Sequence, residues 1–283
     1  MHMLKSLLPD IVLDIKFACQ QFKSVHGHYP NLLNPKSFNE KVVHRSLFDN
    51  RPILKTLADK FAMREFVAKR IGDAFLPEMY HCTENPDDIP FQDFPTRYVV
   101  KPTHGSGWVK VVKDKTKVNT AELTEQCHSW LSEDYYERCR ERVYRNIIPR
   151  IMVEEYIDDG LDGGPADYKF AVFHGRVAFV NVIYDRFGSL RGLLLDRNWT
   201  PMNPQFAADL MNDSTPAPAG PPPPHYSEMR EIAEKLGAEF DFIRVDLYST
   251  PDRIYVGELT TTPGAGLDPF HPKSFDRELG ALW

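Results

Sequence analysis

The sequence predicts an α+β protein in which helices and antiparallel hairpins follow one another along the chain. Residues 7–71 are dominated by helical spacing of apolar residues, whereas residues 168–184 and 243–260 are rich in β-branched and aromatic residues. Each of the two β-rich stretches contains turn residues at its centre, which is typical of a hairpin. With 283 residues, of which 42% are hydrophobic, the chain can bury the core of one large domain or two small ones.

The N-terminal part is expected to be a helical lobe that covers residues 1–54. Helical patterns occur at Leu7–Phe22 and Asn39–Phe48 and are separated by Gly27, Pro30 and Pro35. A third helix is predicted over Lys55–Ile71, with Gly72 as its stop signal. Its polar side carries Asp59-Lys60, for which a solvated charged face is the simplest explanation.

A strand, a glycine-rich loop and a second strand are predicted over residues 97–112. Arg97–Lys101 is β-branched, Gly105-Ser106-Gly107 follows, and Trp108–Val112 resumes the β pattern. The loop is neither a Walker loop nor a G-x-G-x-x-G fingerprint. Its backbone N–H groups can still approach a phosphate closely, with Lys101 supplying positive charge, although a plain hairpin turn remains the alternative.

The middle of the chain is predicted to hold one helix for packing and one strand that ends in carboxylates. The helix is expected over Thr120–Arg145. Ile151–Val153 then forms a strand that leads into Glu154-Glu155-Tyr156-Ile157. Carboxylates at a strand end can accept hydrogen bonds from adenine or ribose, and they can equally face solvent.

The hairpin Tyr168–Phe173 and Arg176–Tyr184, joined at His174-Gly175, is the clearest in the chain. Lys169 is the single lysine within its first strand, so a phosphate contact or exposure of the amine to solvent is expected. Two further segments follow, a stretch with arginines that is either an anion-receiving loop or a basic surface, and an extended proline-rich linker. They comprise Arg186, Arg191 and Arg197, and Pro216–Pro224.

The hairpin Ile243–Tyr248 and Ile254–Thr260 carries a candidate metal site. A turn centred near Pro251 places Asp246 and Glu258 on one face as diagonal neighbours and Arg244 opposite Glu258. Magnesium uses one or two protein carboxylates and completes its coordination with phosphate oxygens and water. The pair therefore suits a metal–nucleotide site, and a solvated acidic face is the alternative.

Composition excludes several classes of function. The formal net charge is −6, from 34 Lys and Arg against 40 Asp and Glu, which argues against binding nucleic acid through a bulk basic surface. Four dispersed cysteines without a C-x-x-C pair favour free thiols in a reduced compartment. No signal peptide and no membrane-spanning stretch is recognised, so a cytoplasmic protein is expected.

In this order the motifs resemble the ATP-grasp superfamily, and most closely its TupA-like (teichuronopeptide biosynthesis) branch. The resemblance covers the chain from about residue 30 to near the end. It is carried by Asp59-Lys60, by Val99–Pro102 with Gly105–Gly107, by Val153–Ile157, by Lys169, by Arg244–Asp246 with Glu258–Thr260, and by the flanking text Asn34–Lys41 and Pro263–Gly266.

The resemblance implies two α+β subdomains that clasp ATP and Mg²⁺, at residues 55–150 and 151–283. It assigns the metal to Asp246, Glu258 and Thr260 and a catalytic role to Arg244 and Lys169. Many relatives have asparagine where this chain has Thr260, and the N-terminal lobe lacks their βαβ pattern. The nucleotide is assigned to Lys60, Lys101, His104, Gly105, Ser106, Gly107, Glu154, Glu155, Ile157 and Lys169.

The activity implied by the resemblance is an ATP-dependent carboxylate–amine ligase that works through an acyl phosphate. The implied substrates are a uronic-acid-containing sugar or cell-surface polysaccharide precursor and an amino acid or amine. An ATP-dependent phosphotransferase, a glycosyltransferase of polysaccharide biosynthesis and a nucleotide-binding sensor are the alternatives. The sequence does not specify an oligomeric state.

Overall fold

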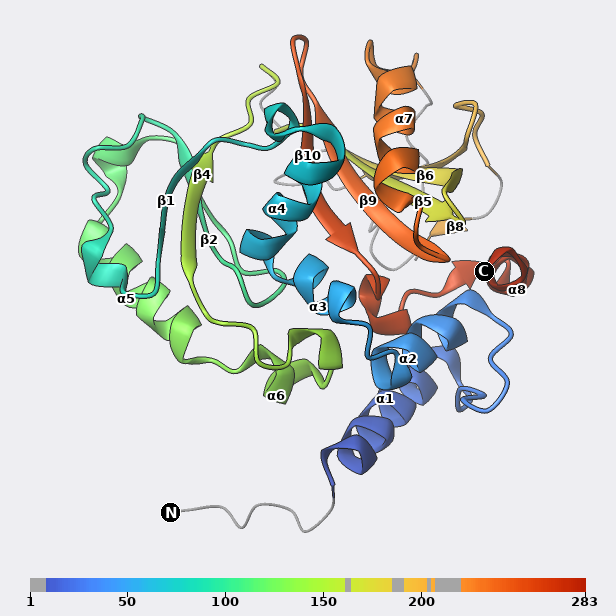
Figure 1. Cartoon of the computed structure of the whole chain (residues 1–283). Helices are drawn as coiled ribbons and strands as arrows, with labels where there is room; N and C mark the ends of the chain where they lie inside the picture. The colour runs from blue at the N-terminus through green and yellow to red at the C-terminus, as the bar shows by residue number, and fades with distance from the viewer. Residues whose placement is uncertain (1–8, 161–163, 185–190, 203–204, 207–219) are drawn as a thin grey trace.

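The computed structural model describes residues 9–160, 164–184, 191–202, 205–206 and 220–283. Its described residues contain two larger antiparallel sheets flanked by helices and one two-stranded sheet, which confirms the predicted α+β class. In Figure 1 the smaller sheet lies on the left, the larger sheet on the right, and the first two helices lie below. Arg186 of the predicted basic loop and Pro216–Ala219 of the predicted linker fall outside the described residues.

The smaller sheet has the strand order β1-β4-β2-β3. One of its faces is apolar and packs on α5 (Thr120–Ser132) through Leu123, Cys127 and Trp130. Lys101 and Glu154 lie on the opposite face, because neighbouring residues of a strand point in opposite directions. The strands are β1 (Met79–Thr83), β2 (Tyr98–Pro102), β3 (Lys110–Val112) and β4 (Ile151–Glu155).

The larger sheet has the order β10-β9-β5-β6-β7, and each neighbouring pair is antiparallel. The predicted hairpin over residues 168–184 is confirmed, and its turn residues His174 and Gly175 have φ of 47° and 74°, as a tight type I′ turn requires. The strands are β5 (Asp167–Phe173), β6 (Arg176–Tyr184), β7 (Arg191–Asp196), β9 (Phe242–Ser249) and β10 (Ile254–Thr260).

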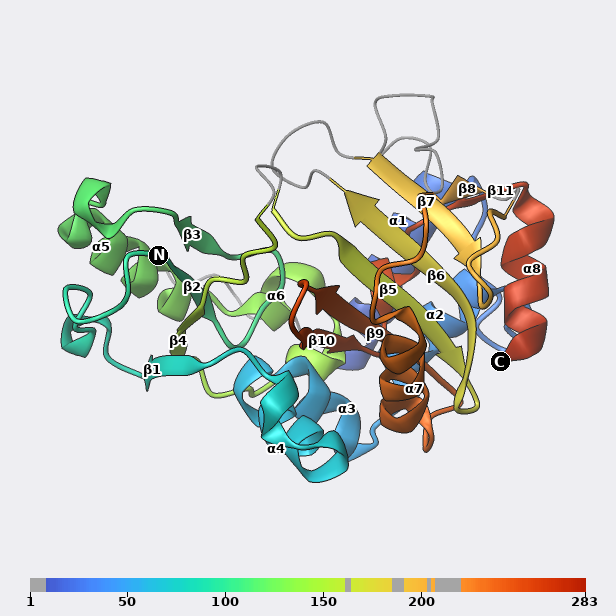
Figure 2. The same cartoon turned by 90° about the horizontal axis from the view of Figure 1, so that it is seen from above.

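Helices cover both faces of the larger sheet. One face packs on α3 (Pro52–Ala58), α4 (Lys60–Ile71) and α7 (Tyr226–Gly237). The other face packs at one end on α2 (Phe38–Phe48) and α8 (Lys273–Leu282). The rest of this second face carries the polar residues of β5 and β9. Figure 2 shows the two sheets beside each other, with α3 and α4 next to both.

Two predicted helices are each broken by an aspartate. Instead of one helix over Lys55–Ile71, the chain forms α3 and α4, because the Asp59 side chain accepts hydrogen bonds from the N–H groups of Phe61 and Ala62 and so caps α4. Instead of one helix over Thr120–Arg145, α5 is followed by α6 (Tyr135–Cys139), whose N-terminus is capped by Asp134. Lys60 is therefore the first residue of a helix.

The predicted register of the β9–β10 hairpin is corrected by a bulge at Gly257. Val256 pairs with Leu247, whereas Glu258 pairs with Asp246, so that Gly257 is the extra residue. Glu258 is therefore directly opposite Asp246 rather than diagonal to it, and Thr260, not Glu258, pairs with Arg244. The predicted sharing of one face by the two carboxylates is correct.

The N-terminal lobe is helical in the described residues, and short elements complete the fold. Because β4 pairs with β1 and β2, it belongs to the smaller sheet. The chain therefore passes from the smaller sheet to the larger one after residue 155. The division into residues 1–54, 55–150 and 151–283 stays a prediction. The remaining elements are α1 (Asp10–His26), the 3₁₀ turns η1 (Asp73–Phe75), η2 (Pro86–Asp88), η3 (Lys115–Lys117), η4 (Arg142–Tyr144) and η6 (Pro263–Gly266), and the paired strands β8 (Gln205–Phe206) and β11 (Phe270–His271).

All four cysteines are free, as predicted. Within the described part of the chain, none of the helices combines the length and the apolar character needed to cross a bilayer.

Candidate active site

The larger sheet brings together five of the predicted site residues. Asp246 on β9 is buried and lies between two cations. Lys169 Nζ on β5 is 2.6 Å from its Oδ2, and Arg244 Nε on β9 is 2.7 Å from its Oδ1. Arg244 Nη2 also donates to Thr260 Oγ1 at 3.1 Å and lies 3.9 Å from Glu258 Oε2 on β10. Cross-strand pairing explains the cluster, since Lys169 pairs with Asp246 and Thr260 with Arg244.

The charges in this cluster stabilise one another. Burial alone would raise the pKa of Asp246, but Arg244 and Lys169 outweigh it and hold this pKa below its ordinary value. Burial would lower the pKa of Arg244, but Asp246, Glu258 and Asp167 raise it, so that the guanidinium stays charged. Asp167, which sequence reasoning missed, contacts Lys169 Nζ at 2.8 Å. Its position two residues before Lys169 on the same strand face was the available signal.

A second group of site residues lies on the smaller sheet and at the start of α4. Lys101 on β2 forms an ion pair with Glu154 on β4, and Arg64 of α4 lies 3.8 Å from the same carboxylate. Lys60 donates a hydrogen bond to the carbonyl of Gly105 in the glycine-rich loop, and its own N–H donates to the Thr103 carbonyl at 3.1 Å. The start of α4 is thereby tied to the loop.

Lys60 connects the two groups electrostatically. Burial lowers the pKa of its amine; Glu258 of the larger sheet opposes that shift, Lys101 adds to it and Glu154 opposes it. The charge of Lys60 therefore interacts with charged residues of both groups, which couples the two groups electrostatically. The site then contains the cations Lys60, Lys101, Lys169 and Arg244.

The glycine-rich loop has the conformation that its glycines allow. Gly107 has φ of 77°, and a Cβ on Gly105 would lie 2.8 Å from the ring of Trp108 and 2.9 Å from that of Tyr135. Tyr135 also interacts with the Ser106 side chain, and burial raises its pKa to about 12. The loop is thus packed against α6.

Two predicted nucleotide residues use their side chains in other contacts, and a third has an apolar side chain. His104 is buried and its ring forms a hydrogen bond with the Trp130 carbonyl of α5 at 3.1 Å, so that the ring faces α5. Glu155 accepts hydrogen bonds from Tyr255 Oη at 2.8 Å and from the Glu78 N–H at 3.0 Å. The side chain of Ile157 is half-buried and apolar. Nucleotide binding by these three residues stays a prediction.

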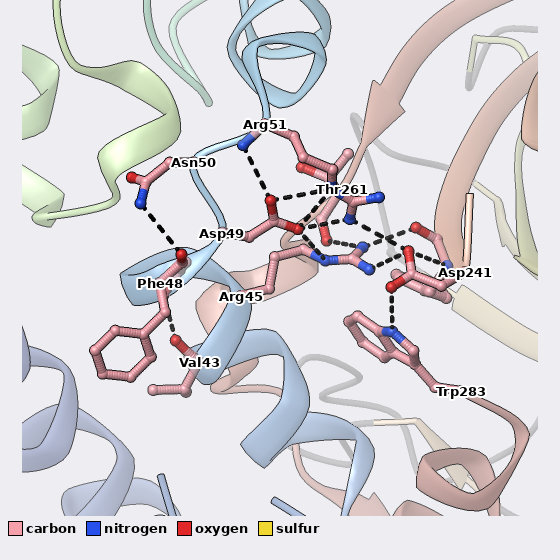
Figure 3. Close-up of polar contacts among 11 residues, drawn as sticks. Val43, Arg45, Phe48, Asp49, Asn50, Arg51, Asp241, Thr261 and Trp283 are labelled. Carbon is pink, nitrogen blue, oxygen red and sulfur yellow. Dashed lines mark hydrogen bonds and ion pairs between the residues drawn. The ribbon is translucent and has the colours of Figure 1, made fainter. Parts of the chain in front are cut away.

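The residue that follows the C-terminal end of β10 is held in place by a buried arginine of α2. Arg45 donates to the carbonyls of Phe242 at 2.8 Å and Thr261 at 3.3 Å and lies 2.5 Å from Asp241 Oδ1. The Arg45 guanidinium also lies 4.1 Å from the centre of a Trp283 ring. Figure 3 shows Arg45 held among Asp241, Thr261 and Trp283. Thr261 directly follows Thr260, so this cluster fixes the end of the candidate metal strand.

Sequence reasoning also missed Glu141, which lies between α6 and η4. Its Oε2 accepts a hydrogen bond from Thr262 Oγ1 at 2.9 Å. Burial and, to a smaller extent, the charge of Glu258 raise the pKa of Glu141, whereas the hydrogen bonds from Thr262 and Cys139 lower it, and the net result is a pKa of about 7. The pKa of Tyr144 is raised by burial and by the nearby carboxylates of Glu141 and Glu258. No spacing rule joins residue 141 to residue 262, because tertiary packing brings them together.

The arrangement fits a magnesium–nucleotide group. In the described part of the chain, no three His, Cys, Asp or Glu side chains are grouped to hold a metal ion by themselves. A metal here would therefore take part of its coordination from phosphate, as magnesium commonly does. Asp246 uses three of its roughly four acceptor positions on Lys169 and Arg244, and Glu258 has its nearest ion-pair partner 3.9 Å away. These two carboxylates retain acceptor capacity beside several cations.

Similar solved structures are ligases, at low sequence identity. D-alanine–D-alanine ligase from Bacillus anthracis, complexed with ATP, is 16% identical with a TM-score of 0.42, over 75% of this chain and 56% of that one. The ATP-grasp ligase PsnB, complexed with a phosphomimetic variant of its minimal precursor, Mg and ADP, is 12% identical with a TM-score of 0.45, over 82% and 60%. D-alanine–D-alanine ligase from Helicobacter pylori is 18% identical with a TM-score of 0.43, over 75% and 55%.

The matched region is thus less than two thirds of each of these ligases. No curated protein has a sequence that matches this chain significantly.

A family model identifies the class directly from the sequence. The model of the TupA-like ATP-grasp proteins matches residues 40–283, which is most of the chain. The α+β fold is accordingly that of an ATP-grasp protein. Within that class, the chain belongs to the TupA-like ATP-grasp family, and the resemblance drawn from the motifs is confirmed.

Proposed function

We propose that this protein is an ATP-dependent ligase that joins a carboxylate to an amine through an acyl phosphate. The observation that carries the proposal is the cluster of Lys169, Arg244, Asp246, Glu258 and Thr260 on three adjacent strands, electrostatically linked to Lys60 and Lys101. Cations that neutralise phosphates beside carboxylates that can share a metal ion are the parts that phosphoryl transfer requires. Membership of the ATP-grasp class, whose members are typically ATP-dependent ligases, supports the same reaction.

In this proposal each side chain has an electrostatic or positioning role. Lys101 and Lys169 neutralise the nucleotide phosphates, and Lys60 contributes both charge and the tether to the glycine-rich loop. Arg244, which remains charged, holds the oxygens of the transferring phosphoryl group. Asp246, Glu258 and the hydroxyl of Thr260 would hold Mg²⁺, which supplies charge neutralisation for the phosphate oxygens. Preorganisation by the sheet lowers the barrier, because the charges need little rearrangement during reaction.

The proposed carboxylate substrate is a uronic-acid-containing sugar or a cell-surface polysaccharide precursor, and the second substrate is an amino acid or amine. We propose a cytoplasmic location, because the reaction consumes ATP and the four cysteines are free thiols. This choice of substrate class follows from membership of the TupA-like family.

The test is to incubate the protein with Mg-ATP, a panel of uronic acids and a panel of amines, and to measure ADP, phosphate and product mass together. Production of ADP and phosphate with a new amide mass supports the ligase. AMP and pyrophosphate would instead indicate adenylation and exclude an acyl phosphate. A stable phosphoester formed without amine would identify a phosphotransferase, and turnover of a sugar nucleotide without ATP would identify a glycosyltransferase.

A further inference from the structure

Glu141 differs from the other carboxylates of the site in having no cation beside it. Asp246 is paired with Lys169 and Arg244, Glu154 with Lys101, and Glu258 lies near Arg244. Among the described residues, no lysine, arginine or histidine forms an ion pair with Glu141. The titratable groups that act on it are Cys139 and Glu258, and neither carries positive charge.

The backbone around Glu141 is built to direct this side chain toward the site. Its neighbours Arg140 and Arg142 both reach Asp14 of α1, at 3.8 Å and 3.5 Å, and Asp14 is fully buried. Tyr136 of α6 donates a further hydrogen bond to Asp14 at 2.9 Å. With both neighbours anchored on α1, Glu141 instead meets Thr262, two residues beyond the candidate metal residue Thr260.

A partly buried carboxylate without a counter-ion is destabilised, and a cation supplied by a ligand removes that destabilisation. The Glu141 side chain is only half-buried, so that a small ligand can reach it. In the proposed reaction, the substrate that enters as a cation is the amine, since amino groups are protonated at neutral pH. An ammonium group must also lose a proton before its nitrogen can attack an acyl carbon.

We propose that Glu141 receives the ammonium group of the amine substrate and accepts the proton that this group must lose. This inference rests on the proposed ligase function. The deprotonated nitrogen forms a bond to the acyl carbon, the bond from that carbon to the phosphate oxygen breaks, and phosphate leaves with the electron pair. The second proton of the attacking nitrogen leaves with the phosphate. Thr262 is a positioning residue, because its hydroxyl fixes one oxygen of Glu141.

The test compares Glu141→Gln with wild type, using two nucleophiles and the same carboxylate. The amine substrate is an ammonium ion at neutral pH, whereas hydroxylamine is already uncharged and needs no base before attack. Glu141→Gln should lower amide formation at least about 100-fold while leaving ATP-dependent hydroxamate formation within about threefold of wild type. Glu133→Gln, the same change at an exposed position of this segment, should leave both reactions unchanged.

Three outcomes would overturn the inference or its basis, and they can be told apart. Equal loss of amide and hydroxamate would place Glu141 in carboxylate activation rather than amine binding. Unchanged amide formation would remove any role for Glu141 in the reaction. If wild type forms neither product and no ADP with any carboxylate, the ligase proposal itself fails.

A second measurement tests the unpaired carboxylate without using activity. An acid whose pKa is raised by folding holds its proton more tightly in the native state, so its stabilising effect is lost as pH rises from about 4.5 to about 7. The melting temperature of Glu141→Gln should therefore rise relative to that of wild type across this range and stay constant above it. A difference that does not change with pH would show that Glu141 is compensated by a cation and would overturn the inference.

Discussion

Arg45 offers the most quantitative test of how the candidate site is held, because Arg51 is a matched control. Both guanidinium groups contact Asp241 Oδ1, at 2.5 Å and 3.4 Å, but the side chain of Arg45 is 3% exposed and that of Arg51 is 41% exposed. Arg45→Met keeps the length of the aliphatic stem and removes the charge. Arg51→Met makes the same chemical change at the surface.

The expected loss of stability for Arg45→Met is about 3–4 kcal/mol. Removing one member of a buried ion pair costs roughly 3–5 kcal/mol, and the lower half applies because Asp241 is 38% exposed and keeps Arg51 and the Trp283 indole as partners. The carbonyls of Phe242 and Thr261 also lose a charged donor, a loss that is not additive with the first. Arg51→Met should cost about 0–1 kcal/mol, as for an exposed pair.

Urea unfolding followed by circular dichroism measures both variants. The Arg45 variant should unfold at a lower urea concentration with an unchanged slope, which identifies a change in stability rather than in the denatured state. In the background of Asp241→Asn, the effect of Arg45→Met should shrink, because the pair is already broken. A loss below about 1 kcal/mol, or equal losses for the two arginines, would refute the reasoning from burial.

Four further predictions address the site. Glu258→Gln should lower ATP turnover at least about 100-fold, with an unchanged melting temperature, and normal turnover would remove Glu258 from the metal site. Lys101→Ala should weaken ATP binding measured by calorimetry at least about tenfold, and unaltered affinity would contradict its contact with phosphate. Mg²⁺ alone should raise the melting temperature less than Mg-ATP does, because Lys169 and Arg244 already bind most of the acceptor positions of the Asp246 carboxylate. Equal shifts in melting temperature would show a preformed metal site. Wild type should lose stability as pH falls from about 4 to about 2, since Arg45 outweighs burial and holds the pKa of Asp241 at about 2; Asp241→Asn should reduce this acid sensitivity in thermal unfolding, and an identical pH profile would contradict the assignment.

The hairpins and their polar residues could be predicted because strand periodicity is a local property. The β-rich pattern of residues 168–184 placed Lys169 within the first strand of a hairpin. The alternation of side-chain direction along a strand placed Asp246 and Glu258 on a shared face. The exact register failed at Gly257, although the signal was present. Val256 and Leu259 both enter the same core at a spacing of three, which a regular strand does not allow and a bulge does.

The helix breaks were also encoded locally. Asp59 and Asp134 each start a new helix by accepting backbone N–H bonds, and an aspartate inside a helical pattern is a recognised capping signal. The helical spacing of apolar residues continues across both aspartates, and so it predicted one continuous helix at each place. Periodicity therefore identified where helices occur but not where one ends and the next begins.

Glu141 could not be found from the sequence, and its case shows why such residues escape pattern reading. Nothing in the order of residues 139–145 differs from a charged helix surface. Its position depends on the ion pairs that its neighbours Arg140 and Arg142 form with Asp14, and on its own hydrogen bond with Thr262, 121 residues later. Contacts of this kind are created by the packing of whole elements, and single-sequence rules describe only neighbours along the chain.

The anchoring of the Glu141 segment on α1 has a practical consequence for anyone who shortens the protein. The family match begins at residue 40, whereas Asp14 lies within Asp10–His26. A truncation guided by the matched region alone would retain both sheets and the charged residues of β5, β9 and β10, but would expose Tyr136, Arg140 and Arg142 without their common partner. The shortened chain would lose the support of the Glu141 segment, so activity assays belong on the 283-residue chain.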